Sequence, residues 1–507
     1  MRLLFVSSEV YPFAKTGGLA DVSEALPRAL ANLGADVRIL MPAYGCALRK
    51  LSRPQPIADL SGILGVKDAR LLSARLPGSD IPVWLADAPE LYHRDGLYQN
   101  NRGEDWPDNA RRFAFLSHVA ARIGKGALAP RWQPDVIHAN DWHTGLVPLL
   151  VSASTEPGPA CVFTLHNLAF QGLFPAEDVA GLDLPQDSFT PDGVEYYGKI
   201  SFLKAGIRFA DKLTTVSPTY AREILTDDYG FGLNGLLRAR ASDLTGILNG
   251  ADYGIWDPAH DAFLPTNYDF SGLTGKKLCK LALQRELGLS ANPDLPLLAF
   301  ISRLTEQKMA DVLLELMPKL ARQELQLCVL SDGDHELERR FRQVARAHAG
   351  TVAVRIGYQE PLAHRMQAGA DLLLAPARFE PCGLTQIYAM RYGTVPVVRA
   401  TGGLADTVVD TSRISISDGT ATGFVFAEPS TADLGEAITR ALAFYREPLA
   451  WRRLQLNDMK QDFSWQRSAN TYLSLYQSLT GRFREELRRT PAHTSLAGAP
   501  AIEKALA

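Results

Sequence analysis

The chain has 507 residues, which is too long for one ordinary hydrophobic core and predicts two large domains. Hydrophobic residues make up 46% of the sequence and charged residues 21%, a balance typical of a globular α/β enzyme that excludes disordered and fibrous classes. The formal net charge of −3 offers no electrostatic footprint for nucleic acid or an anionic membrane, so a phosphate-bearing ligand must be held by a few placed cations.

The N-terminal half opens with a predicted strand, helix and strand. An apolar run at 3–7 predicts the first strand, and a Gly-containing loop leads from it into a helical pattern over 19–33. Because the later strand-like runs each lead into a loop or helix, we expect an open parallel sheet covered on both faces. These later runs are 37–41, 82–86, 136–139 and 161–165.

The same order of strands and helices begins again near residue 296. The predicted elements are a helix over 311–322 and strands at 297–301, 325–330, 352–356, 371–375 and 395–398. The Gly- and Asn-rich segment 245–254 precedes them and marks the domain junction. We therefore predict an N-terminal domain over 1–246, a C-terminal domain over 247–460, a helix over 461–481 that crosses back, and a mobile tail over 482–507.

One hexapeptide, Thr-Gly-Gly-Leu-Ala-Asp, occurs at residues 16–21 and again at 401–406. Each copy can be a plain strand-to-helix turn, because Gly allows positive φ and an acid in the first turn favours a helix start. The two copies also place backbone N–H groups on both sides of a cleft. Such groups bind phosphates and sugar hydroxyls.

Three cations precede predicted helices. Lys15 can add a full positive charge to the N–H groups of a helix start, which suits a diphosphate, although a plain turn is an equal alternative. Its loop is neither a Walker A motif nor the GxGxxG of dinucleotide enzymes. Arg303 and Lys308 follow the strand at 297–301, where α/β sheets bind ligands, and can stabilise a departing diphosphate without a metal. Solvated surface charges are the alternative for this pair.

The stretch 378–386 follows the strand at 371–375 and places Glu380 before a tight turn. The N–H groups of Gly383, Leu384 and Thr385 are predicted to open the next helix. The carboxylate can then face a sugar while these donors face a diphosphate. A structural Glu that caps the turn is the alternative.

Two N-terminal stretches, 138–143 and 164–167, mix polar and aromatic side chains at strand ends, a mixture that suits sugars. His138 is the residue that we expect to be an ordinary core histidine. The sequence has no HExxH motif and no Cys/His ligand cluster. Although residues 332–334 resemble a metal-binding DxD motif, a simple turn explains them, so we expect no metal.

Together these stretches resemble the bacterial glycogen synthase and plant starch synthase family, and the similarity runs from residue 1 to about 480. The resemblance implies a GT-B fold, in which two Rossmann-like, doubly wound parallel-sheet domains of the α/β class face a deep cleft. It also implies transfer of glucose from ADP-glucose to the non-reducing end of an α-1,4-glucan, with retention of configuration and release of ADP. The most specific stretches are 15–21, 141–143, 166–167, 303–308 and 378–386.

The resemblance also implies roles for individual residues. The implied catalytic set is Glu380, His166, Asp141, Arg303 and Lys308. The implied substrate-binding set is Lys15, Gly18, Asn249, Tyr358, Cys382, Gly383, Leu384 and Thr385. Lys15, Arg303, Lys308, Gly18 and Thr385 would hold the diphosphate, and Tyr358 would stack near the adenine. The transferred glucose would be contacted by Asp141, Glu380, His166 and Asn249. The partners are then ADP-glucose and glycogen, with no cofactor, metal, nucleic acid or membrane, while the oligomeric state and the choice between same-face attack and a covalent intermediate stay open.

Two positions depart from the pattern. Tyr388 stands where related retaining transferases often carry a second Glu, which fits the glycogen and starch synthase branch. Met309 stands where the family usually shows Gly, and its side chain either crowds the nucleotide or leans away. The alternatives are a GT-B transferase with another donor or acceptor, a catalytically silent glucan-binding protein, and, because GxGxxG is missing, only weakly a dinucleotide oxidoreductase.

The five cysteines are odd in number and widely spaced, which predicts neither a disulfide framework nor a zinc site and fits a reducing cytosol. The apolar stretch at the N-terminus is too short for a signal peptide, and no apolar run approaches the length of a membrane span. We therefore expect a cytoplasmic protein. The absence of a transit peptide favours a bacterial enzyme and, with it, ADP-glucose over UDP-glucose.

Overall fold

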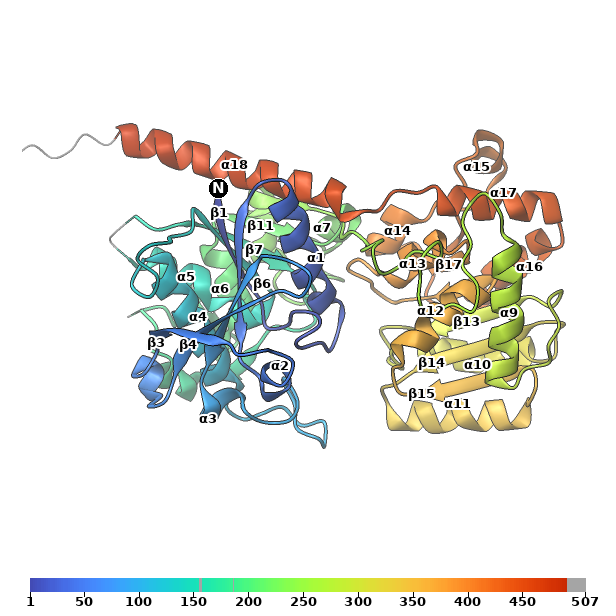
Figure 1. The fold of residues 1–507 in the computed structure, drawn as a ribbon, viewed down its shortest axis with the longest axis horizontal. Coiled ribbons are helices and arrows are strands. Elements are labelled where there is room, and N and C mark those ends of the chain that lie inside the picture. The colour runs from blue at the N-terminus through green and yellow to red at the C-terminus, as the bar shows by residue number, and fades with distance from the viewer. Residues whose placement is uncertain (155–156, 186, 490–507) are drawn as a thin grey trace, which may run out of the picture.

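The computed structural model describes residues 1–154, 157–185 and 187–489 and forms two lobes that lie side by side (Figure 1). The N-terminal lobe is coloured blue to green, the C-terminal lobe is yellow to orange, and the red helix α18 (Trp465–Arg489) runs back over the first lobe. The helix predicted to end at residue 481 thus continues to Arg489. The remainder of the predicted tail, from residue 490, lies outside the described residues.

The N-terminal sheet has nine strands in the order β12-β11-β7-β6-β1-β2-β5-β4-β3. From β5 to β11 this is the doubly wound order 3-2-1-4-5-6, with all neighbours parallel. The edge differs from the predicted parallel sheet, because β3 and β4 are antiparallel. The short connection 76–81 between β4 and β5 allows only a hairpin. The strands are β1 (Arg2–Val6), β2 (Asp36–Pro42), β3 (Gln55–Asp59), β4 (Arg70–Arg75), β5 (Pro82–Asp87), β6 (Val136–Asn140), β7 (Ala160–Leu165), β11 (Lys212–Thr215) and β12 (Leu244–Gly246).

The C-terminal sheet has six parallel strands in the order β15-β14-β13-β16-β17-β18, which is again 3-2-1-4-5-6. The predicted pair of Rossmann-like domains is therefore confirmed. A small sheet of β8 (Leu173–Pro175), β10 (Lys199–Ser201) and β9 (Glu195–Tyr196) was not predicted. The six strands are β13 (Leu297–Ile301), β14 (Gln326–Ser331), β15 (Val352–Ile356), β16 (Leu372–Ala375), β17 (Val395–Arg399) and β18 (Phe424–Phe426).

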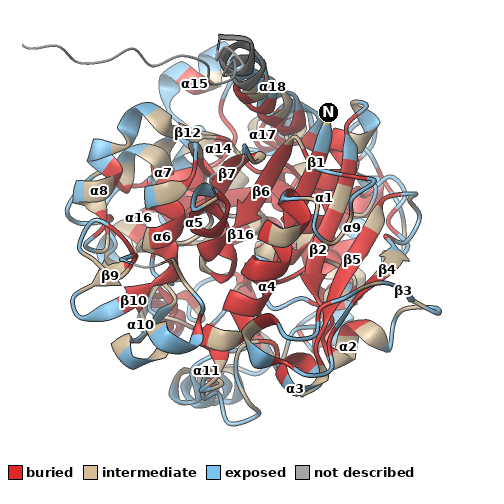
Figure 2. Cartoon of the chain, turned by 90° about the vertical axis from the view of Figure 1, so that its left-hand side faces the viewer, coloured by how far each residue is buried: buried red, intermediate tan, exposed pale blue. Residues whose placement is uncertain are grey.

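Helices cover both sheets, and exposed residues gather on their outer faces and in loops (Figure 2). No helix in the described part of the chain is both long and apolar enough to span a bilayer. In the first lobe the helices are α1 (Gly18–Asn32), α2 (Gly45–Leu48), α3 (Pro89–Tyr92), α4 (Asn109–Gly124), α5 (Leu146–Ser152), α6 (Phe202–Phe209), α7 (Pro218–Glu223) and α8 (Asn234–Ala239). In the second they are α9 (Thr274–Leu287), α10 (Ala310–Leu320), α11 (His335–Ala347), α12 (Glu360–Gly369), α13 (Thr385–Arg391), α14 (Gly402–Thr407), α15 (Arg413–Asp418), α16 (Thr431–Tyr445) and α17 (Pro448–Met459).

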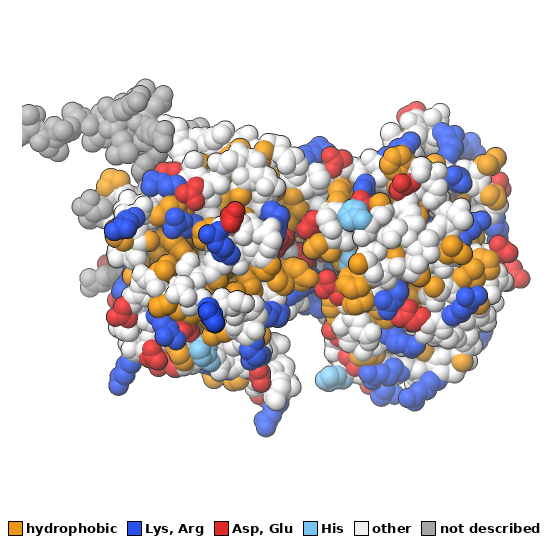
Figure 3. Space-filling view, viewed as in Figure 1, with side chains coloured by type: hydrophobic (Ala, Val, Ile, Leu, Met, Phe, Trp, Pro, Cys, Tyr) orange, Lys and Arg blue, Asp and Glu red, His pale blue; other side chains and the backbone are white. Residues whose placement is uncertain are grey.

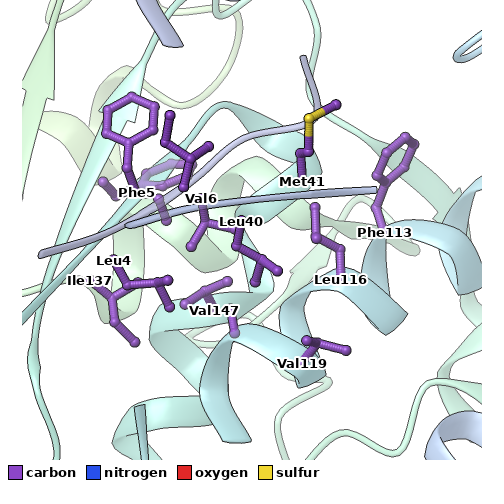
Figure 4. Packing of buried hydrophobic residues seen from close by; sticks show 14 of the residues in the cluster. Leu4, Phe5, Val6, Leu40, Met41, Phe113, Leu116, Val119, Ile137 and Val147 are labelled. Carbon is purple, nitrogen blue, oxygen red and sulfur yellow. The ribbon is translucent and has the colours of Figure 1, made fainter. Parts of the chain in front are cut away.

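The N-terminal core contains side chains from distant parts of the chain. Figure 4 shows residues of β1, β2, α4 and α5 packed together, among them Leu4, Leu40 and Leu116. Helix α18 completes this core, because Tyr472 and Tyr476 are almost fully buried in the same cluster. The burial of these apolar strands and helix faces fixes the positions of the loops at the strand ends.

Candidate functional site

Most of the predicted site residues follow the strands at which the order of each sheet reverses, whereas His166, Asn249 and Tyr358 follow β7, β12 and β15. In the N-terminal sheet this point lies between β1 and β6, and in the C-terminal sheet between β13 and β16. Ligands of doubly wound proteins bind outside the carboxyl ends of such strands. Lys15 follows β1, Asp141 follows β6, Arg303 and Lys308 follow β13, and Glu380 follows β16. Figure 3 shows the two lobes in contact near the junction and separated by a notch below it.

The two C-terminal loops are bonded to each other. The Arg378 N–H donates to the carbonyl of Gln307 at 2.8 Å, and the Gln307 amide donates to the carbonyl of Phe379 at 3.2 Å. Lys308 forms an ion pair with the buried carboxylate of Glu380. Arg303 is exposed, and its guanidinium makes no hydrogen bond or ion pair with any described residue. Arg378 is also paired, with Asp311 at 2.7 Å, so the loops hold two paired cations and offer Arg303 as a free cation to an anionic ligand.

Met309 has a left-handed backbone, with φ 51° and ψ 32°, at the residue before α10. This conformation favours Gly, which explains why Gly suits the position. The Met309 side chain is fully buried in the C-terminal core with Leu304 and Leu313, so it leans away from the loop surface. Tyr388 is likewise a packing residue, stacked at 4.1 Å on Trp256.

The turn after Glu380 presents free donors. Gly383 adopts φ +72°, and within the described residues the N–H groups of Gly383 and Leu384 donate to no acceptor. Thr385 begins α13, as predicted. Burial raises the pKa of the Cys382 thiol to about 12, although a hydrogen bond with the Asn249 backbone lowers it. The thiol therefore stays protonated and packs as a small side chain.

Asn249 carries an unpartnered acceptor. Its side-chain oxygen is buried and accepts no hydrogen bond from any residue that the structure describes. A buried polar atom without a partner is costly, so its presence indicates a place where a ligand hydroxyl can donate.

Predicted residues of the two domains meet at the start of α1. The Lys15 ammonium lies 2.7 Å from the Asp21 carboxylate and 5.9 Å from the ring centroid of Tyr358 in the other domain. Tyr358 is 52% exposed, so its ring face is available for stacking. A Cβ on Gly18 would lie 3.7 Å from the side chain of Leu384. The diphosphate and adenine residues implied by the resemblance are thus neighbours in space.

Glu9 holds the Lys15 loop and was missed by the sequence analysis. The Thr16 N–H and hydroxyl donate to its carboxylate at 2.5 and 2.6 Å, the Gly17 N–H donates at 3.2 Å, and the Tyr98 hydroxyl donates at 2.6 Å. Glu9 is almost fully buried. The available signal was an acid seven residues before the Thr-Gly-Gly turn.

Asp141 is strained and electrostatically perturbed. Its φ of 62° and ψ of 174° lie in a region that is essentially restricted to Gly, and such strain costs about 1–3 kcal/mol and clusters at functional sites. Burial raises the pKa of Asp141 from 3.8 to about 7, the charge of Glu9 raises it further, and a hydrogen bond from the Trp142 N–H opposes the shift. The carboxylate thus changes charge near neutral pH.

His166 lies beside Asp141, because it follows β7, the parallel neighbour of β6. Its Nε2 lies 3.1 Å from the side-chain oxygen of Asn140, which makes Nε2 the donor. Burial lowers the pKa of His166 to about 3, so the ring is neutral. His138 is a core histidine, as expected, and bonds to Thr164 and Tyr476 through its two nitrogens.

Carboxylates of the two domains lie near one buried tyrosine, Tyr220. Burial is the main cause that raises the pKa of Tyr220, and the charges of Asp141, Glu223 and Glu380 raise it further. Asp141 and Glu223 belong to the N-terminal domain and Glu380 to the C-terminal domain. The structure therefore brings the predicted sugar-binding acids to the same region.

No metal centre is formed by the described residues, since no group of three or more His, Cys, Asp or Glu side chains can hold an ion. In the stretch that resembles a DxD motif, the Asp334 carboxylate caps α11 by accepting from the Leu337 N–H at 2.9 Å. The stretch is therefore a β-bridge of Gly333 with Leu304 followed by a helix cap, where a simple turn was predicted.

Comparison with known proteins gives consistent matches. The family described as Starch synthase catalytic domain matches residues 2–239, and the family described as Glycosyl transferases group 1 matches residues 288–453. A glycogen synthase of Burkholderia thailandensis is 51% identical over 487 residues, which cover 95% of this chain and 91% of the relative. A glycogen synthase of Paramagnetospirillum magneticum is 51% identical over 484 residues, which cover 95% of this chain and 98% of the relative.

Two solved structures are also similar. The catalytic domain of starch synthase IV from Arabidopsis thaliana, bound to ADP and acarbose, matches with a TM-score of 0.85 and 31% identity, over 95% of this chain and 99% of that one. A sucrose-phosphate synthase from Thermosynechococcus elongatus matches with a TM-score of 0.59 and 16% identity, over 95% of this chain and 99% of that one. The second likeness concerns the fold alone.

Proposed function

The chain belongs to the glycogen and starch synthase family, and from this premise we propose that it transfers glucose from ADP-glucose to the non-reducing end of an α-1,4-glucan. It acts as a glycogen synthase and releases ADP with retention of configuration. The observation that carries the proposal is the meeting of the Lys15 loop with Tyr358 and Leu384 of the facing domain. This arrangement supports a nucleotide-sugar site between the domains.

The donor diphosphate is assigned to the cations of both domains. The free Arg303 offers two parallel hydrogen bonds to a phosphate, and Lys15 and Lys308 add point charges. The unbonded N–H groups at Gly383 and Leu384, with Thr385, add neutral donors, and Gly18 leaves room for close approach. Tyr358 stacks on the adenine. Together these groups stabilise ADP as it leaves, with no metal and no cofactor in the proposal.

The transferred glucose is assigned to Asp141, His166, Asn249 and Glu380. Ionised Asp141 and the unpartnered oxygen of Asn249 accept from sugar hydroxyls, while neutral His166 lies beside them. Lys308 fixes the position of Glu380 through their ion pair, and Cys382 fixes the turn by packing. Such fixed partners orient the sugar for attack. Same-face attack and a covalent intermediate are both compatible with this placement.

Closure of the two domains excludes water, so that a glucan hydroxyl outcompetes hydrolysis. The partner is therefore a neutral polymer, glycogen, and neither nucleic acid nor a membrane surface. All five cysteines are free thiols, which supports a place in the reducing cytoplasm.

The test measures release of ADP or UDP from ADP-glucose and UDP-glucose, each with and without glycogen. We expect glycogen-dependent ADP release. No turnover from either donor would contradict the proposal and favour another sugar nucleotide or a silent binding protein. Lys308→Ala and Glu380→Ala should each lower turnover by about a hundredfold with native melting, whereas Lys319→Ala, on the exposed face of α10, should not.

A further inference from the structure

Helix α7 of the N-terminal domain and helix α14 of the C-terminal domain supply hydrogen-bond acceptors to each other's first turn. The Thr219 N–H and hydroxyl donate to the Asp406 carboxylate at 2.8 and 2.6 Å. In return, the Thr401 hydroxyl and the Gly402 N–H both donate to Glu223 at 3.0 Å. We call these five residues the cross-domain clasp. Because each domain completes a helix start in the other, the clasp can form only when the domains are together.

The clasp rests directly on the backbone of Glu380. The Gly403 N–H donates to the Glu380 carbonyl at 3.1 Å. A Cβ on Gly402 would lie 1.8 Å from that same carbonyl oxygen, and a Cβ on Gly403 would lie 2.2 Å from the carbonyl oxygen of Cys382. The turn that Glu223 holds is thus packed tightly against the turn that carries Glu380, and a shift of one turn would displace the other.

Glu223 is bound on one oxygen only. Its second carboxylate oxygen is buried and has no hydrogen-bond partner among the described residues. Burial raises the pKa of Glu223, and the bonds from Gly402 and Thr401 oppose the rise. Separation of the domains would return this oxygen to water. When the domains come together, Glu223 therefore gains two hydrogen bonds on one oxygen and loses hydration on the other, so its free energy depends on the position of the domains.

We propose that Glu223 is a positioning residue, which couples closure of the two domains to the placement of the Glu380 loop. The inference rests on the proposed function, in which Glu380 contacts the transferred glucose. In this structure, Glu223 fixes Thr401 and Gly402, and the next residue, Gly403, fixes the Glu380 backbone. When the domains part, this support is lost, so the donor site is complete only while water is excluded.

The kinetic test compares Glu223→Ala with Glu223→Gln. Since Gln keeps an oxygen acceptor, we expect Glu223→Ala to lower kcat by about tenfold or more and Glu223→Gln to restore it to within about threefold, with KM for ADP-glucose changed less than kcat. The matched control is Glu315→Ala, whose carboxylate accepts from the Thr431 hydroxyl at 2.7 Å within one domain. It should keep normal turnover.

The second arm uses Thr401→Val, which removes the hydroxyl that donates to Glu223. In a double-mutant cycle the combined variant should be no slower than Glu223→Ala alone, because both changes break one contact. Unchanged kcat in Glu223→Ala, equal losses in the Ala and Gln variants, or additive losses in the cycle would overturn the inference.

The third arm separates this inference from the proposed function. Small-angle X-ray scattering of the full chain, with and without ADP, measures compaction directly. We expect ADP to compact the unmodified chain and Glu223→Gln, and to compact Glu223→Ala less. If the unmodified chain lacks glycogen-dependent turnover, the proposed function fails. The compaction of the three proteins by ADP still tests whether Glu223 supports closure of the domains. Equal compaction of all three proteins would count against it.

Discussion

The hexapeptide at 16–21 and its copy at 401–406 start helices α1 and α14 in the two domains. In both, the Thr hydroxyl and the next Gly N–H donate to a glutamate. The first glutamate, Glu9, belongs to the same loop, whereas the second, Glu223, comes from the other domain. Gly17 is extended with φ −155°, but Gly402 has φ +45°. An identical local sequence thus fixes which donors are offered, while the surroundings decide the backbone angle and the acceptor.

The largest expected difference between the copies concerns their first glycines. A Cβ on Gly17 would meet nothing within 4 Å, whereas one on Gly402 would clash with the Glu380 carbonyl and hold a left-handed backbone. Gly402→Ala should therefore lower the free energy of unfolding by about 3 kcal/mol, and Gly17→Ala by less than about 0.5 kcal/mol. Urea denaturation of both variants checks this. Equal losses would contradict the different environments.

Removal of the two glutamates should also differ in its effect. Glu9→Ala removes a buried acceptor that Thr16, Gly17 and Tyr98 share, and should destabilise the N-terminal domain by about 2 kcal/mol. Glu223→Ala should change the melting of either domain by less than about 1 kcal/mol, because its donors face water once the domains part. Calorimetry of the two variants measures this, and a larger loss in Glu223→Ala would reverse the comparison.

Substitution of the last residue of each copy, Asp21 or Asp406, should have a smaller effect, which differs in the kinetic constant that changes. Asp21 pairs with Lys15, and both side chains are 28% exposed, so Asp21→Asn should leave stability unchanged. It removes a negative charge beside the proposed diphosphate site and should lower KM for ADP-glucose by about threefold at low salt. Asp406→Asn weakens the clasp and should instead lower kcat by about threefold. Steady-state kinetics at two salt concentrations distinguish the two patterns.

A final contrast between Glu9 and Glu223 concerns the pH dependence of the reaction. Asp141, with its pKa raised to about 7, is neutral below that pH, so kcat/KM should fall about tenfold for each unit below it. The folded chain binds this proton more tightly than the unfolded chain, so stability falls as pH rises from 3.8 to about 7. Glu9→Gln removes a charge that raises this pKa and should move the kinetic inflection to lower pH, while Glu223→Gln should not. An inflection that survives in Asp141→Asn would assign it to another group.

Much of the fold could be predicted because apolar runs bounded by loops report buried strands directly. The strands predicted at 297–301 and 352–356 have the observed bounds. The antiparallel edge of β3 and β4 was missed, because the apolar pattern of one strand does not indicate the direction of the strand beside it. The backbone of Met309 was also beyond prediction, because a residue other than Gly at positive φ is sustained by its surroundings.

The loops of the candidate site could be predicted because each follows a strand end. The glutamates that accept hydrogen bonds from these loops could not be predicted. Glu9 lies near Thr16 in the chain, but Glu223 is 178 residues from Thr401, and their contact depends on how two complete domains dock. The backbone of Asp141 likewise has a partner outside its own loop, because the Asp141 N–H donates to the Thr164 carbonyl of the neighbouring strand at 2.9 Å.

Helix α18 carries a consequence for synthesis on the ribosome. Tyr472 and Tyr476 belong to the core of the first lobe, and the Ser468 hydroxyl donates to the carbonyl of Leu248 at 2.5 Å. Domains usually fold as they emerge, but here the earliest lobe to be translated waits for one of the last segments. The nascent chain therefore exposes the apolar surface that α18 covers from the completion of β12 until residues 465–489 have emerged. A stalled or truncated product should be a substrate for chaperones that bind exposed apolar surface.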